Sequence, residues 1–168
     1  MNRKKFIRSS LLTLSGLATA PSLLTAQEQK KAGPLKLETG KEFVEAGHGN
    51  LDKVKLMLKE QPNLIYSRHD WGNGDFEEAI EGAGHVGNKD IANYLISQGA
   101  RVNLFVLTML GNTDLVKPVL EDYPQLLFAS GPHGFTLLHH AKAGGDSAGE
   151  LYEYLQQKGL NKTQVRIK

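Results

Sequence analysis

Apolar residues recur along this chain at helical rather than strand spacing. Four stretches carry aliphatic or aromatic residues three and four positions apart: Val54, Leu56, Met57 and Leu58; Ile91, Ala92, Tyr94, Leu95 and Ile96; Leu115, Val116, Val119 and Leu120; Leu151, Tyr152, Tyr154 and Leu155. Side chains at this spacing share one face of a helix. Each stretch therefore predicts a helix with one buried face.

A Gly-Asn or Gly-Asp pair precedes each of these stretches. The glycines are Gly49, Gly87, Gly111 and Gly145, so the steps between them are 38, 24 and 34 residues. Asn and Asp are good N-caps because their side chains accept hydrogen bonds from the free amides of the first helical turn. A shorter apolar piece lies ahead of each glycine, at residues 43–46, 79–83, 105–110 and 137–143. The pattern predicts four helix–turn–helix units.

Two of these units also end alike. The segment 58–66 (LKEQPNLIY) reappears as 120–128 (LEDYPQLLF), 62 residues later, with proline, a polar residue, two aliphatics and an aromatic in register. Repetition at this scale is typical of architectures in which small units stack on one another.

Three motifs resemble those of the ankyrin-repeat family. Residues 134–141 (GFTLLHHA) follow the family pattern G-x-T-P-L-H-x-A, with Leu137 in the proline position; residues 99–103 (GARVN) and 62–66 (PNLIY) resemble repeat endings. The resemblance covers about residues 38–160. It implies an all-α solenoid of about four stacked repeats with short or irregular β-turn fingers. It also implies structural roles for Thr136 and His139.

The finger regions of these units differ in length. The 24-residue step leaves no room for a hairpin between the second and third units, whereas the 38-residue step contains an enlarged loop at residues 68–75. The resemblance implies that a protein partner binds finger tips and inner helices, which on this chain gives the candidates Arg68, His69, Trp71, Asn73, Pro132, His133 and Phe135. Aromatic and arginine side chains often dominate such interfaces. Alternatively, Trp71 folds back to cover the end of the stack.

The amino terminus has the three parts of a signal peptide. Arg3, Lys4, Lys5 and Arg8 precede an apolar stretch at residues 11–24, and Ala26 offers a cleavage site. Residues 3–8 resemble a twin-arginine signal with lysine in second place, so both the general and the twin-arginine routes remain open. We expect a signal peptide at 1–26, a flexible lead-in at 27–37, a repeat domain at 38–160 and a tail at 161–168. The protein would be exported to a periplasmic or extracellular location.

Charge and composition limit the partners. The chain carries 20 basic and 18 acidic residues, but without residues 1–26 the balance becomes 16 to 18. The basic character therefore belongs to the targeting segment, and nucleic acid is not an expected partner. The apolar part of that segment is too short for a membrane span. There is no cysteine, so disulfides and thiolate zinc sites are excluded. We expect a monomer.

The six histidines are the main candidates for chemistry. His139 and His140 form the sharpest pair, with His133 able to approach, but neighbours on a helix point about 100° apart and rarely share one metal. His48 and His85 occupy helix-turn positions, where a turn role is expected. His69 and Asp70 could form a base and its orienting acid, although no nucleophile motif accompanies them. The acidic residues Asp75, Glu77, Glu78 and Glu81 indicate a solvated helix face.

These observations predict a non-enzymatic protein-interaction module with no cofactor, no metal and no catalytic residues. The alternative is an accessory or stabilising factor for an exported enzyme. A hydrolase or a metal-binding protein is the less favoured third class.

Overall fold

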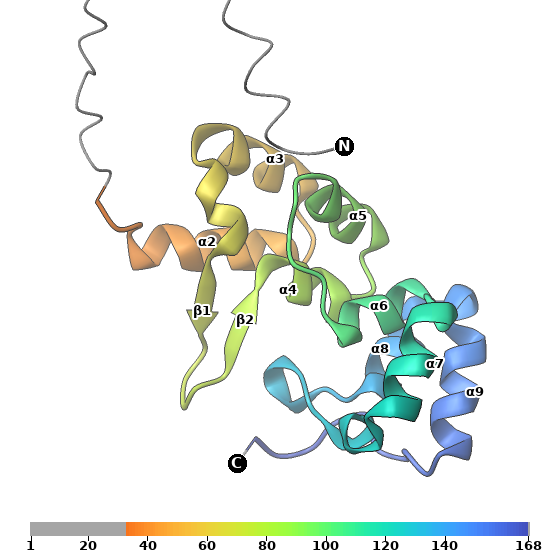
Figure 1. The fold of residues 1–168 in the computed structure, drawn as a ribbon. Coiled ribbons are helices and arrows are strands. Elements are labelled where there is room, and N and C mark those ends of the chain that lie inside the picture. The colour runs from red at the N-terminus through yellow and green to blue at the C-terminus, as the bar shows by residue number, and fades with distance from the viewer. Residues whose placement is uncertain (1–32, 168) are drawn as a thin grey trace, which may run out of the picture. The chain divides into compact units, whose positions relative to one another are not determined.

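The structure, a computed structural model, describes residues 33–167 and is mostly helical (Figure 1). Its helices form successive pairs: α2 (Leu37–Gly47) with α3 (Leu51–Glu60), α4 (Ala79–Val86) with α5 (Lys89–Ser97), α6 (Leu104–Leu110) with α7 (Thr113–Asp122), and α8 (Leu137–Gly144) with α9 (Gly149–Gln157). The first helices of the pairs also pack on one another in the order α2, α4, α6, α8. The prediction of a mainly helical chain is confirmed. The predicted signal peptide and the lead-in up to residue 32 lie outside the described residues.

The Gly-Asn turns join the helices of a pair much as the sequence indicates. The side chain of Asn50 accepts from the amide of Lys53 at 3.0 Å, and that of Asn88 accepts from Ile91 at 3.1 Å. Asn112 lies before α7 without such a bond, so the expected cap is missing there. Gly87 has a φ of 76°, in the left-handed region, and an added Cβ would collide with the backbone of Ala143. Glycine is needed at that turn for both reasons.

The repeated exit segments have the same local structure. Both fold into short 3₁₀ helices, η1 (Pro62–Tyr66) and η2 (Pro124–Phe128). Each begins with its proline, whose fixed φ suits a first helical position. Leu64 and Ile65 are buried in one apolar group with α2 to α5, and Leu127 is buried in a second group with α8 and α9. The repetition in sequence is therefore a repetition of fold and packing.

A two-stranded hairpin lies between the first and second helical pairs. Strands β1 (Arg68–Asp70) and β2 (Phe76–Glu78) pair antiparallel, with His69 opposite Glu77. The hairpin contacts α2 and the start of α4. Between α5 and α6 the described chain has no strand, as the short 24-residue step predicts. The enlarged loop of the sequence is thus a two-stranded hairpin.

The second finger, which we define as residues 129–136 between η2 and α8, is shorter and is fixed by the end of the chain. It contains a single 3₁₀ turn, η3 (Pro132–Gly134). The amide of Val165 donates to the carbonyl of Gly134 at 2.9 Å, and the hydroxyl of Thr136 donates to the carbonyl of Lys162 at 2.6 Å. The expected tail is therefore part of the fold. Among the residues that the structure describes, no helix has the length and apolarity to cross a membrane.

Candidate metal centre

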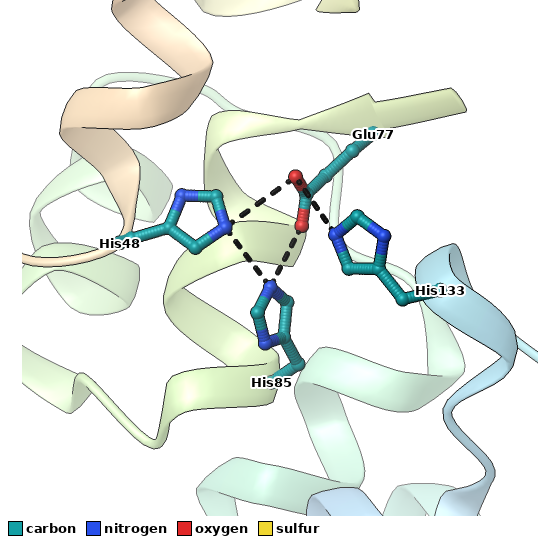
Figure 2. A group of neighbouring side chains, drawn as sticks. All are labelled: His48, Glu77, His85 and His133. Atoms are coloured by element: carbon teal, nitrogen blue, oxygen red, sulfur yellow. Dashed lines mark hydrogen bonds and ion pairs between the residues drawn. The ribbon is translucent and has the colours of Figure 1, made fainter. Parts of the chain in front are cut away.

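Four ionisable side chains from separate elements converge on one point (Figure 2). His48 follows α2, Glu77 lies in β2, His85 lies in the last turn of α4, and His133 lies in η3. One nitrogen or oxygen of each side chain lies within 4.8 Å of those of the other three. Figure 2 shows the imidazole rings arranged around the carboxylate, with nitrogens directed at its oxygens. Such convergence is the geometry of a polydentate binding site.

The distances within this cluster are short. The Nε2 atom of His85 lies 2.9 Å from Glu77 Oε1. The Nε2 atoms of His48 and His133 lie 3.4 Å and 3.5 Å from Glu77 Oε2. The Nε2 atoms of His48 and His85 are also only 3.0 Å apart. A single hydrogen on His85 Nε2 cannot serve both the carboxylate and the second imidazole.

Close packing of α2 against α4 brings two of these histidines together. A Cβ added to Gly47 would collide with the backbone of Ala79, so the two helices touch without intervening side chains. A Cβ on Gly82 would lie 2.8 Å from the ring of His48. The missing side chain at Gly82 therefore provides the space in which the His48 ring reaches His85.

Glu77 is completely buried, and burial governs its chemistry. Its side chain is 0% exposed, and Oε1 has no hydrogen-bond partner of good geometry. Burial by itself raises the pKa of Glu77, but the contacts with His48 and His85 and the hydrogen bond from Trp71 outweigh it and lower the pKa to about 2. In turn, its interaction with Glu77 raises the pKa of His48 despite partial burial. The centre thus holds a buried anion surrounded by imidazoles.

The hydrogen bonds of the rings show that Nε2 is the nitrogen of His48 and His133 that faces the centre. The Nδ1 atom of His48 donates to the carbonyl of Val44 at 3.0 Å, and Nδ1 of His133 donates to Asp75 at 2.8 Å. In a neutral imidazole whose Nδ1 carries the hydrogen, Nε2 is an acceptor. Lone pairs and a carboxylate directed at one point repel unless a cation lies between them. Either protons on the imidazoles or a metal ion can supply this positive charge.

The donor set fits a transition-metal ion. Zinc binds imidazole nitrogen at about 2.0–2.1 Å and carboxylate oxygen at about 2.0–2.2 Å, which places tetrahedral ligand atoms about 3.3 Å apart. The contacts of Glu77 with the three imidazoles are 2.9, 3.4 and 3.5 Å. Nitrogen and oxygen ligands of this kind also suit iron, nickel and copper ions. The ligand atoms of the four side chains lie within 4.8 Å of one another, so a divalent ion would bind once the side chains move inward to ligand distance.

An aromatic shell surrounds the four side chains. The indole of Trp71 donates to Glu77 Oε2 at 2.7 Å, and its ring lies 6.4 Å from that of His48 and 6.0 Å from that of His133. On another side Phe135 stacks on His139 with 3.9 Å between ring centroids. Trp71 therefore lies against the centre and against α2.

Comparison with models of protein families, with curated proteins and with solved structures found no match. Neither a relative nor a family pattern assigns a role to any residue of this cluster. The geometry and charge of the side chains themselves are what indicate a function.

Three of the predicted partner-binding residues, Trp71, His133 and Phe135, lie at this centre. His69 contacts Trp71 but is not one of the four converging side chains. Of the others, Arg68 pairs with Glu78 and Glu81 on the opposite face of the hairpin, Asn73 is exposed at its tip, and Pro132 is buried. A role for these residues in partner binding stays a prediction.

Several expectations about individual ionisable residues are wrong. The acidic run is not a solvated helix face, because Glu77 lies in a strand and both Glu77 and Glu81 are buried. Asp70 does not orient His69, since its carboxylate accepts from the amides of Gly72 and Gly74. His133 approaches His48 and His85 rather than the pair at 139–140.

The sequence contained one usable signal for the cluster. His48 and His85 both fall at the ends of first helices in consecutive units, and helices that stack side by side place such ends together. Glu77 gave no comparable signal, since the alternation that buries it spans only a three-residue strand.

Proposed function

We propose that this protein binds a divalent transition-metal ion, with zinc as the best match, through His48, Glu77, His85 and His133. One observation carries the proposal. Three imidazole nitrogens and a wholly buried carboxylate oxygen without a hydrogen-bond partner are directed at a common point. An ionised group in such a place is costly unless a positive charge compensates it.

The hydrogen bonds at Nδ1 of two histidines support a metal centre. His48 and His133 already use Nδ1 in hydrogen bonds to groups outside the cluster. Metal-binding histidines typically donate their second ring nitrogen to a carbonyl or carboxylate, which fixes the ring and leaves the other lone pair for the ion. Two of the three histidines satisfy that rule: His48 donates to a carbonyl and His133 donates to a carboxylate.

The origin of the ligands supports a role in binding and cross-linking. They come from the end of α2, the hairpin, the end of α4 and the second finger. An ion bound to all four would fasten both fingers to the first and second helical pairs. Because a metal binds the assembled site and not the unfolded chain, its binding free energy would stabilise the fold.

We also propose that the scaffold is an ankyrin-type solenoid, which the consecutive packing of the first helices supports. A second candidate function is recognition of a protein partner outside the cytoplasm, including an exported enzyme that this protein assists. The outer face of the hairpin favours it, because Arg68 and Phe76 are about half exposed there and Asn73 is exposed at the tip.

Metal titration of the purified protein tests the main proposal. Zinc affinity is measured by competition with a chromophoric chelator, and cobalt absorption reports the coordination geometry. We expect one ion per chain and a tetrahedral cobalt spectrum. His85→Gln should weaken binding at least a hundredfold, since it removes an imidazole ligand, whereas His69→Gln serves as a control from the same neighbourhood. Absence of stoichiometric binding, or equal affinity in His85→Gln, would overturn the proposal.

The partner proposal needs a separate test. Arg68→Ala and Asn73→Ala change the outer hairpin face and leave the four ligands in place. We expect both to weaken capture of a specific partner from the extracytoplasmic fraction while zinc affinity stays unchanged. Capture that is unaffected by either change would reject the assigned surface.

A further inference from the structure

One ligand of the centre, His133, comes from much farther along the chain than the others and is fixed by a carboxylate of the hairpin. Asp75 lies where the turn of the hairpin enters β2. Its Oδ2 accepts the Nδ1 hydrogen of His133 at 2.8 Å, and its Oδ1 accepts the backbone amide of the same residue at 2.8 Å. A single side chain thereby fixes the position of the His133 backbone and the rotation of its ring.

The backbone of His133 requires such fixing. Its φ is 57°, in the left-handed region, which costs a residue with a Cβ roughly 1–2 kcal/mol. Its amide is bound by Asp75, and its carbonyl accepts from the side chain of Gln164 at 2.8 Å. An unfavourable backbone conformation that several contacts maintain is typical of functional positions.

We infer that Asp75 is a positioning residue of the metal centre, which orients His133 for coordination. This inference rests on the proposed metal-binding function. The Nδ1–H bond to Asp75 keeps the hydrogen away from Nε2, whose lone pair then points towards Glu77. A carboxylate in this position also makes the imidazole a stronger ligand. His48 obtains its orientation from the carbonyl of Val44 instead.

The hairpin register explains how one finger performs two tasks. Asp75 and Glu77 are two residues apart, so in an extended strand their side chains point to the same face. Trp71, which bonds to Glu77, lies on that face as well. Glu77 supplies a ligand atom, and Asp75, whose side chain is 12% exposed, fixes a ligand supplied by the other finger.

Substitution Asp75→Asn tests the inference on the full chain. Asparagine has nearly the same shape but lacks the charge, so we expect zinc affinity to fall about 10- to 100-fold, the usual effect of losing an outer partner of a metal ligand. The stoichiometry should remain one ion per chain. Asp70→Asn is the matched control: it removes the same charge from the same hairpin, and an amide oxygen can keep the bonds to Gly72 and Gly74. Its zinc affinity should equal that of the wild type.

Nitrogen NMR of the metal-free protein at pH 8 provides a readout that does not depend on metal. Wild-type His133 should carry its hydrogen on Nδ1, and Asp75→Asn should shift the hydrogen towards Nε2. A wild-type His133 protonated on Nε2 alone would overturn the inference, even if Asp75→Asn failed to fold. Equal zinc affinity in wild type and Asp75→Asn would also overturn it while leaving the metal site intact. A wild type that binds no zinc would reject the proposed function, and the tautomer would then show only whether Asp75 orients the His133 ring.

Discussion

Two regions of the molecule bury an ionisable side chain, and they do so in opposite ways. At the hairpin, Glu77 is buried beside three imidazoles and stays charged, with its pKa lowered to about 2. In α8, His140 is buried against Phe105 and donates only to the carbonyl of Thr136, and burial lowers its pKa to about 4, so that it is neutral. Burial disfavours the charged form in both places, and only charged or strongly polar partners reverse its effect.

The difference separates a binding site from a core position. His140 needs nothing further, because its one hydrogen is bound and the neutral ring packs among apolar side chains. Glu77 stays charged, has an oxygen without a hydrogen bond of good geometry, and faces three imidazoles with which it can bind a cation. Burial of a titratable group therefore indicates function where the group stays charged and several side chains that can bind a cation face it.

Removal of the Glu77 charge should have the largest effect. Glu77→Gln keeps the shape of the side chain but leaves the histidines without an anion, and loss of one partner of a buried charged pair costs about 3–5 kcal/mol. We expect zinc affinity to fall about a thousandfold in a chelator-competition measurement. Glu81→Gln is the matched control, since Glu81 is also buried but bonds to Asn103 and to the amide of Glu78. A similar loss in both variants would mean that general destabilisation causes it.

The loss of stability on acidification should show that His140 is neutral in the folded protein. Between pH 6.5 and about 4 the unfolded chain binds a proton at this residue and the folded chain does not, so stability falls as the pH is lowered through that window. The loss amounts to at most about 3 kcal/mol. Urea unfolding of the metal-free protein at pH 7 and pH 4.5 measures it. In His140→Phe the pH dependence should be smaller by this amount, and an unchanged dependence would contradict a neutral His140.

Much of the scaffold could be predicted from the sequence, because helical periodicity and cap residues act locally. The stripe through Val54 and Leu58 and the cap at Asn50 required only neighbouring residues. The repeated exit at Pro62 and Pro124 was equally local.

The centre could not be predicted in the same way, since its ligands are brought together by tertiary packing. Glu77 becomes buried because a short hairpin folds against α2, and His133 arrives from a finger more than fifty residues later in the chain. The spacing of His139 and His140 within one helix says nothing about histidines that lie on different elements. Ligands that come from four different elements can bind one ion at any spacing in the sequence, so they form no sequence motif.

The hydrogen bond from the Trp71 indole should stabilise ionised Glu77, with a smaller effect than the two changes above. Trp71→Phe keeps an aromatic ring over the centre but removes the hydrogen bond to Oε2, and a bond to a charged group stabilises by roughly 1.5–3 kcal/mol. We expect a loss of about 2 kcal/mol in the unfolding free energy of the metal-free protein. The same change in a Glu77→Gln background should cost clearly less, because the bond partner is then uncharged. Equal costs in both backgrounds would show that the ring and not the bond matters.

Filling the space beside the His48 ring should have the smallest effect. In Gly82→Ala the new Cβ would lie 2.8 Å from the His48 ring, closer than atoms approach, so the ring must shift away from His85. We expect about a tenfold loss of zinc affinity, equivalent to about 1.4 kcal/mol. Gly40→Ala in α2 is the control, because its Cβ would meet only Ser67 Cβ at an ordinary 3.7 Å. Alanine favours a helix over glycine by about 1 kcal/mol, so Gly40→Ala should gain stability without losing metal affinity. A Gly82→Ala protein that binds zinc as tightly as the wild type would mean that His48 contributes no ligand to the ion.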